Sequence, residues 1–156
     1  MTADSRTVPT FTSGGVTSAT MEKLPKGYIA RGYADSSQSG ITGETTLADL
    51  SSVAFTTAAG RRLEVKVSCH VQAGTADKSW TLKVKDGATT LFTVTGTVPV
   101  ASKDQFVSYS AMIDGWTAGS HTLNTTLASD DGTTAFTMSA ASSKQAQISV
   151  SDVGPT

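Results

Sequence analysis

Cysteine is almost absent from this sequence, since Cys69 is the only one among 156 residues. One cysteine excludes a disulfide within the chain, so the fold must be held together by its hydrophobic core. Cys69 falls on the apolar face of a predicted strand, with no evident environment that would activate a thiol. We predict a small buried side chain rather than a reactive nucleophile.

Charged residues are also scarce. They make up 16% of the chain, against roughly 25% in an average domain, and the formal net charge is -1. There is no basic stripe of the kind that binds nucleic acid or an anionic membrane, so we expect neither partner. Ser, Thr and Gly take the place of charge. That composition is typical of β proteins, and of proteins packed beside many copies of themselves, where charge would repel.

Long apolar runs are missing as well. No segment approaches the roughly 20 apolar residues that a membrane helix needs. The first residues, 1–6, lack the apolar centre of a signal peptide. We therefore expect a protein that is made in a cytoplasm and has no membrane partner.

The patterns of catalytic and metal sites are absent too. His70 and His121 lie on different predicted strands, and neither has ligands at metal-binding spacing. His70 is expected on a solvated face. Residues 130–132 read Asp-Asp-Gly, which lacks the spaced carboxylates of a calcium loop and predicts a hairpin turn. No nucleophile-elbow motif is present. We predict a protein without enzymatic activity, metal or cofactor.

What the sequence does contain is strict two-residue alternation, clearest between Arg62 and Gln72. Successive side chains in a strand point to opposite faces, so this run predicts a strand with one buried and one wet face. The buried face would consist of Leu63, Val65, Val67, Cys69 and Val71.

Similar pieces separated by turns fill the rest of the chain from Gly27. Asp86-Gly87 is a strong turn signal between two of them. The expected strands cover residues 28–34, 52–57, 63–72, 80–85, 89–98, 106–113, 121–127, 135–138 and 145–153. Residues 41–50 are a weaker extended segment, within which a turn is compatible with the sequence. The fold class is therefore all-β. We predict an antiparallel β-sandwich of jelly-roll type with an extended N-terminal arm.

Residues 1–26 form the arm, and residues 27–156 form the sandwich domain. The composition changes at Pro25-Lys26-Gly27, and the arm has too few large apolar residues for a core of its own. It is either a mobile tail or an attachment element that packs on something else. If it docks, its anchors are expected to be Phe11, Val16, Met21 and Leu24.

Trp116 is the one aromatic residue predicted in a loop. Exposed aromatic rings bind the faces of sugars, so Trp116 is a candidate glycan contact. The alternative is a ring that folds over the end of the sandwich or fills a subunit interface, and we favour that interpretation.

Several stretches, taken in order, resemble small β-sandwich virion surface proteins of tailed phages that infect actinobacteria. The first is an arm that enters the first strand through a Leu-Pro-Lys-Gly step, and the last is a closing strand that ends in Gly-Pro. The stretches are residues 21–30, 39–45, 59–65, 85–91, 118–123 and 148–155. Each is weak alone, but together they extend over residues 21–155.

The resemblance implies a structural place in a bacteriophage virion, as a homotrimer. It fits a capsid decoration protein that attaches through its arm to the major capsid protein or another virion protein. Because the chain is short, we expect decoration of the head rather than a tail fibre. A minor tail protein that binds a receptor or a host-surface glycan is the alternative. In either case the protein would be on the virion surface after synthesis in the bacterial host cytoplasm.

Overall fold

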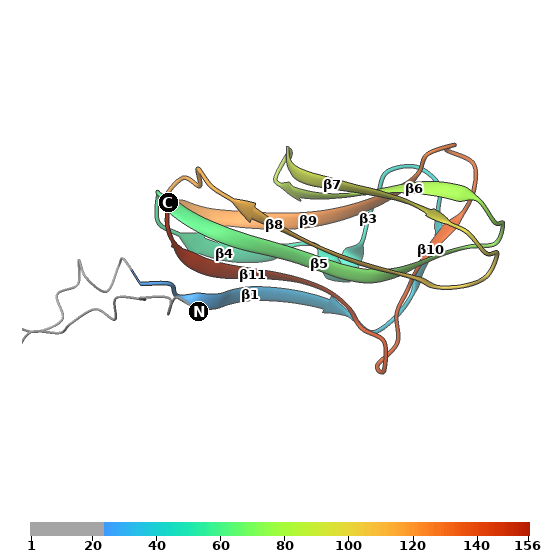
Figure 1. Ribbon diagram of the computed structural model, residues 1–156, viewed down its shortest axis with the longest axis horizontal. Helices are drawn as coiled ribbons and strands as arrows, with labels where there is room; N and C mark the ends of the chain where they lie inside the picture. The colour runs from blue at the N-terminus through green and yellow to red at the C-terminus, as the bar shows by residue number, and fades with distance from the viewer. Residues whose placement is uncertain (1–23) are drawn as a thin grey trace, which may run out of the picture.

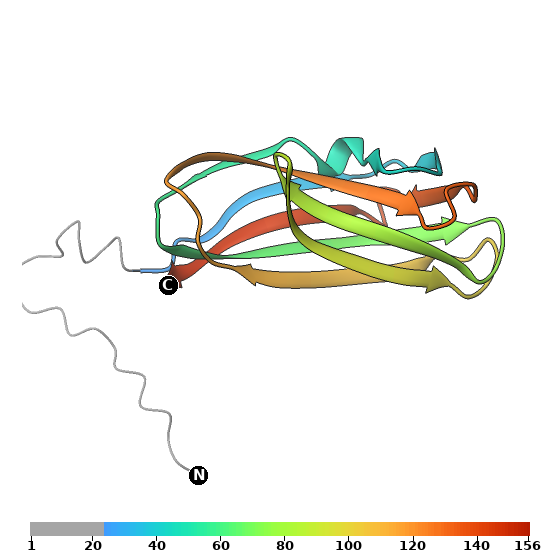
Figure 2. The same cartoon turned by 90° about the horizontal axis from the view of Figure 1, so that it is seen from above.

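The computed structural model describes residues 24–156, which form two antiparallel β-sheets packed face to face (Figures 1 and 2). The first sheet contains β1 (Gly27–Ala34), β2 (Gln38–Ile41), β5 (Arg61–Ala73), β8 (Gln105–Ile113), β10 (Phe136–Ser139) and β11 (Ala146–Pro155). The second contains β3 (Thr45–Thr46), β4 (Val53–Thr57), β6 (Lys78–Asp86), β7 (Thr89–Val98) and β9 (Gly119–Ser129). One short 3-10 helix, η1 (Ala48–Leu50), lies between β3 and β4.

The order of the strands is that of a jelly roll. Across the first sheet the long strands run β1-β11-β5-β8, and across the second they run β4-β9-β6-β7. The chain passes between the sheets in the two Greek keys that define this topology. The predicted all-β jelly-roll sandwich is therefore confirmed.

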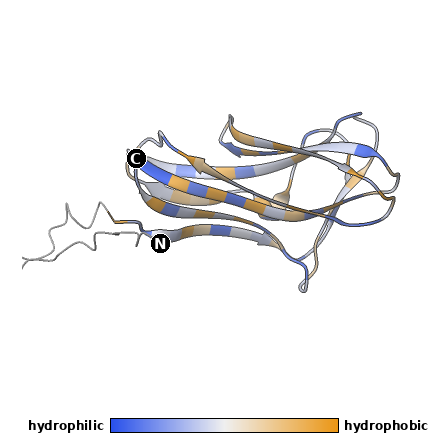
Figure 3. Ribbon diagram, viewed as in Figure 1, coloured by the Kyte–Doolittle hydropathy of each residue, from blue (hydrophilic) through white to orange (hydrophobic). Residues whose placement is uncertain are grey.

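Strand β5 shows the predicted alternation (Figure 3). The five apolar residues expected on its inner face are fully buried, and Arg62 and Lys66 on the other face are exposed. Cys69 is among the buried residues, and loss of solvent raises the pKa of its thiol to about 12. The thiolate is therefore negligible at neutral pH, as predicted for an unreactive cysteine.

Trp80 is the largest fully buried side chain, and one glycine makes room for it. Gly96 lies opposite Trp80 in the β6–β7 ladder. A Cβ atom at position 96 would lie 2.3 Å from Cζ2 of the indole ring. The indole Nε1 donates a hydrogen bond to Oε1 of Gln105 at 3.1 Å, so the polar edge of the ring is satisfied.

The segment 41–50 does contain a turn, which takes the form of a short 3-10 helix: β2 ends at Ile41, and β3 and η1 follow. Leu47 and Leu50 are fully buried there, and a tight helical turn lets both reach the core within four residues. His70 is not simply solvated. Its ring centroid lies 5.1 Å from that of Phe106, and Nδ1 is buried without a hydrogen-bond partner.

Within residues 24–156, no helix has the length and apolar character needed to cross a lipid bilayer.

We predict that Gly96→Ala destabilises the protein by about 1–3 kcal/mol, because the added methyl group would overlap the buried Trp80 ring. The matched control is Gly74→Ala, where a Cβ atom meets nothing within 4 Å. That change should stay within about 0.5 kcal/mol. Urea unfolding followed by tryptophan fluorescence measures both. Equal stabilities of the two variants would contradict the packing described for Trp80.

Candidate functional site

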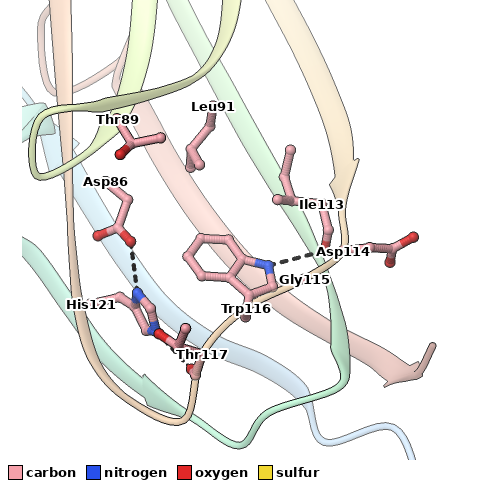
Figure 4. A pocket seen from close by; sticks show the side chains of 9 residues that line it. All are labelled: Asp86, Thr89, Leu91, Ile113, Asp114, Gly115, Trp116, Thr117 and His121. Atoms are coloured by element: carbon pink, nitrogen blue, oxygen red, sulfur yellow. Dashed lines mark hydrogen bonds and ion pairs between the residues drawn. The ribbon is translucent and has the colours of Figure 1, made fainter.

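A pocket of about 270 Å³ opens between the β6–β7 turn and the loop that joins β8 to β9 (Figure 4). The turn exists because Gly87 adopts a left-handed φ of 55° after Asp86. The pocket combines two carboxylates, two threonine hydroxyls and an apolar wall. Its lining consists of Asp86, Thr89, Leu91, Ile113, Asp114, Gly115, Trp116, Thr117 and His121.

Trp116 forms part of the wall of this pocket but is itself buried. Its side chain is 6% exposed, and Nε1 donates a hydrogen bond to the carbonyl of Ile113 at 3.0 Å. The ring meets Phe55 and His121 edge to face, with centroids 5.4 and 4.8 Å apart. The loop tryptophan therefore folds over the end of the sandwich, and its face is not free to stack on a sugar.

His121 is held at both ring nitrogens. Nδ1 lies 2.7 Å from Oδ2 of Asp86, and Nε2 lies 3.0 Å from the carbonyl oxygen of Thr117. Burial opposes the charge on the ring, but the hydrogen bonds to Thr117 and Asp86 outweigh it, so the pKa of His121 is raised above 6.5. Asp86 also accepts a hydrogen bond from the backbone N–H of Thr122.

This Asp–His pair is built to fix two loops rather than to move protons. A general base needs a free nitrogen lone pair directed at its substrate. Here both nitrogens face acceptors, which favours the doubly protonated imidazolium. The pair links the β6–β7 turn to the start of β9, and through Thr117 to the loop that carries Trp116.

A buried ion pair forms a second polar cluster, at the start of β5. Arg61 donates from Nε to Oδ2 of Asp152 at 2.9 Å and from Nη2 to Oδ1 at 2.5 Å. The two side chains are 4% and 3% exposed. The backbone N–H of Gly154 donates to the same carboxylate at 2.9 Å. The cluster therefore ties the start of β5 to the end of β11.

The same arginine fixes the point where the chain enters the sandwich. Nη2 of Arg61 donates to the carbonyl oxygen of Leu24 at 2.7 Å, three residues before β1 begins. The C-terminus lies at this end too, since the N–H of Thr156 donates to the carbonyl of Gly60 (Figure 1). We refer to Leu24, Arg61 and Asp152 as the arm clamp.

The predicted arm anchors can be placed only in part. Phe11, Val16 and Met21 lie outside the described residues. Leu24 is described, and 37% of it is exposed. Its backbone, rather than its side chain, makes the hydrogen bond to the sandwich.

Sequence reasoning missed the two polar clusters. From the sequence, Asp86 is predicted only as a turn residue, and no local pattern marks Arg61 as a member of an ion pair. The partners are 91 positions apart for Arg61–Asp152 and 35 apart for His121–Asp86, so no local spacing announces either pair. In residues 24–156 there is no group of three or more His, Cys, Asp and Glu side chains that could hold a metal ion.

No family model matches the sequence. No curated protein sequence matches it either. Among solved structures, the chain is similar to latent PorU from Porphyromonas gingivalis, with a TM-score of 0.47 and 11% identity over 92% of this chain and 14% of that one. It is also similar to VP2 of infectious bursal disease virus in its subviral particle, with a TM-score of 0.41 and 12% identity over 85% of this chain and 42% of that one.

A third similar structure is the CBM22-1 xylan-binding domain from Paenibacillus barcinonensis, with a TM-score of 0.32 and 15% identity over 87% of this chain and 92% of that domain. The chain spans less than half of the PorU and VP2 chains. At these scores and identities, none of the three similarities carries information about function.

We predict that the stability of the protein falls as pH rises above 6.5 and through the raised pKa of His121. The folded protein binds the proton of His121 more tightly than the unfolded chain does. The stabilisation is therefore complete below the pKa that His121 has in the unfolded chain, and it is lost as the pH rises through the pKa of the folded protein. His121→Gln should flatten this slope, and His70→Gln should retain it. Melting temperatures measured from pH 5.5 to 8.5 provide the comparison. An unchanged slope in His121→Gln would contradict the role of the Asp86 pair.

We also predict that Arg61→Met lowers the free energy of unfolding by about 3–5 kcal/mol, because it leaves the Asp152 carboxylate buried without its charge partner. The neighbouring Arg62→Met is the matched control. Arg62 pairs with Asp114, and the two side chains are 48% and 49% exposed. Loss of that surface pair should cost at most about 1 kcal/mol. Chemical denaturation measures the free energy of unfolding of both variants. Similar losses of stability in the two would contradict the importance of the arm clamp.

Proposed function

We propose that this protein is a structural component of a bacteriophage virion without enzymatic activity, and that it decorates the surface of the capsid. The observation that carries the proposal is the arm clamp. Arg61 holds the carbonyl of Leu24, and Asp152 holds Arg61, so the chain is fixed to the sandwich at Leu24. A fixed exit is what an attachment arm requires, because a rigid body is then positioned by the contacts that its arm makes.

The arrangement of the two ends of the sandwich supports the same proposal. The arm clamp and the loop that carries Trp116 lie toward one end, where Ile113 of β8 pairs with Leu63 just after the start of β5. If the arm binds the major capsid protein or another virion protein, the Trp116 pocket faces the attachment side. A receptor pocket would be expected at the opposite, outward end.

The low charge of the sandwich also suits a protein that stands among copies of itself. Dense packing of like-charged surfaces is opposed by mutual repulsion, and this chain has a formal net charge of -1. In this proposal the protein is made in the bacterial host cytoplasm and ends on the virion surface, with other copies of itself as neighbours.

The alternative is a minor tail protein that binds a receptor or a host-surface glycan. One observation favours it. Tyr28 and Tyr33 on β1 are 59% and 50% exposed, and exposed aromatic rings are suited to stacking on sugars. Both flank Arg31 on the outer face of the first sheet, where the Arg31 guanidinium lies 5.3 Å from the centre of the Tyr33 ring. This platform, rather than Trp116, is where the structure would accommodate a glycan.

The proposal predicts that deleting residues 1–23 abolishes binding to phage heads that lack this protein, while the melting temperature changes little. This truncation keeps Leu24, whose carbonyl Arg61 binds. A full-length chain with residues 1–23 in scrambled order is the matched control, and it should also fail to bind. Co-sedimentation with purified heads, tails and host cells measures the attachment.

Head binding by the truncated chain equal to that of the intact chain would refute attachment through the arm. Binding of the intact protein to tails or host cells, but not to heads, would replace decoration with the alternative. Replacing Tyr28 and Tyr33 with alanine then tests whether the tyrosine platform binds the receptor.

A further inference from the structure

Strand β8 has one edge that pairs with β5 and another that pairs with no strand of the described residues. Natural sheets protect such edges with charged residues, proline, bulges or covering segments, because an open edge can pair with another chain. The nine residues Gln105–Ile113 include no charged residue and no proline. Their register against β5 contains no bulge. By these criteria the edge of β8 is unprotected.

Strand β8 also carries large apolar side chains that the sandwich does not cover. Phe106, Tyr109 and Met112 are 62%, 44% and 57% exposed. The neighbouring edge strand β7 likewise has no charged residue, and its Phe92 ring lies 5.2 Å from the Tyr109 ring. The two edge strands therefore bring no charged side chain of their own to a contact with another protein.

The sequence of β8 is nearly symmetrical about Tyr109. On either side come Ser108 and Ser110, then Val107 and Ala111, and then Phe106 and Met112. If two copies of β8 run antiparallel with Tyr109 opposite Tyr109, each serine faces a serine, Val107 faces Ala111 and Phe106 faces Met112. Only the end pair is mixed, with Gln105 opposite Ile113. A two-fold interface needs this self-complementarity, in which residue i contacts j and j contacts i.

The register with β5 shows that these pairs also match by face. Phe106, Ser108, Ser110 and Met112 lie opposite His70, Ser68, Lys66 and Glu64, and so belong to the outer face of the sheet. Val107, Tyr109 and Ala111 lie opposite Cys69, Val67 and Val65, which point into the core. Pairing at Tyr109 keeps outer residues on the outer face and extends the inner apolar layer from one copy into the next.

We propose that the open edge of β8 binds β8 of a second copy of this chain, antiparallel and centred on Tyr109, to form one sheet that is continuous through both sandwiches. Tyr109 of each copy, together with Phe92 of each, would then form an aromatic cluster across the two-fold axis. This pairing belongs to the isolated protein and does not rest on its place in a virion.

The size of the contact sets the concentration at which it forms. Nine strand residues extend over roughly 30 Å, and a strip of that length hides on the order of 400 Å² per copy. A standard stable interface hides about 800 Å² per partner. We therefore expect a dimer that dissociates on dilution and that forms where many copies stand side by side.

A two-fold contact between strand edges gives a dimer, whereas the resemblance to phage proteins implies a trimer. Sedimentation equilibrium of the full chain from about 10 μM to 1 mM distinguishes them. The mass should rise from 16.0 kDa toward twice that value. Tyr109→Glu should remain monomeric throughout, because two carboxylates would face each other across the axis.

The matched control is Thr56→Glu, which places the same charge at an exposed position on β4 in the other sheet. It should dimerise as the unmodified chain does. A monomer at 1 mM, a trimer, or a dimer that Tyr109→Glu leaves intact would each overturn the proposal.

Cross-linking tests the register. In the paired dimer, residue 109 lies about 4.5–5.5 Å from its own copy between Cα atoms, within the range of a disulfide. Tyr109→Cys should therefore cross-link under mild oxidation. Phe106→Cys should not, although Phe106 is more exposed, because its two copies lie roughly 20 Å apart.

A mixture of Phe106→Cys and Met112→Cys chains should cross-link again, since these two positions face each other. Cys69 is fully buried and does not compete. Equal cross-linking of Phe106→Cys alone and Tyr109→Cys would overturn the register.

Discussion

The central constraint in this fold is the hydrogen bonding of β5, because the first sheet is assembled on it. Strands β11 and β10 pair along one of its edges in succession, and β8 pairs along the other. Its inner residues from Leu63 to Val71 alternate without interruption and are fully buried. A slip of one residue would turn all of them toward solvent and would misplace three partner strands at once. The register of β5 thus determines where β8 lies and what its open edge presents.

Two polar contacts then fix the end of the sandwich at which β5 begins. Arg61–Asp152 joins β5 to β11 and holds Leu24, and Asp86–His121 joins the β6–β7 turn to β9. Loss of Arg61 would leave the Asp152 charge buried without compensation, because both side chains are almost fully buried. Loss of His121 would release the turn from β9, while Asp86 keeps its hydrogen bond from the N–H of Thr122. The arm exit and the Trp116 loop owe their positions to these two contacts, whereas at the other end Asp131 organises its own turn by accepting hydrogen bonds from Ser129, Thr133 and Thr134.

The sequence was sufficient for the strands whose side chains alternate. The bounds of β7 were predicted as found, and those of β5 and β8 to within a residue or two. For residues 41–50 it allowed a turn but not its form, since Leu47 and Leu50 reach the core through a helical turn that two-residue alternation cannot describe. It failed for Arg61 and His121, since the partner that gives each its role is brought near only by the sheet. Alternation predicts which face a residue occupies, but pairing across the fold determines what it contacts there.

The two ends of this sandwich are not equivalent for protein engineering. The C-terminal residue Thr156 is hydrogen-bonded to Gly60 beside the arm clamp, so a peptide fused there would emerge next to the arm. The loop 74–77 follows the far end of β5 and lies outside the strands. A guest sequence inserted in that loop would interrupt no strand pairing and would project away from the arm. The fold is therefore a display platform with a built-in direction, in which the loop rather than the C-terminus would present the guest.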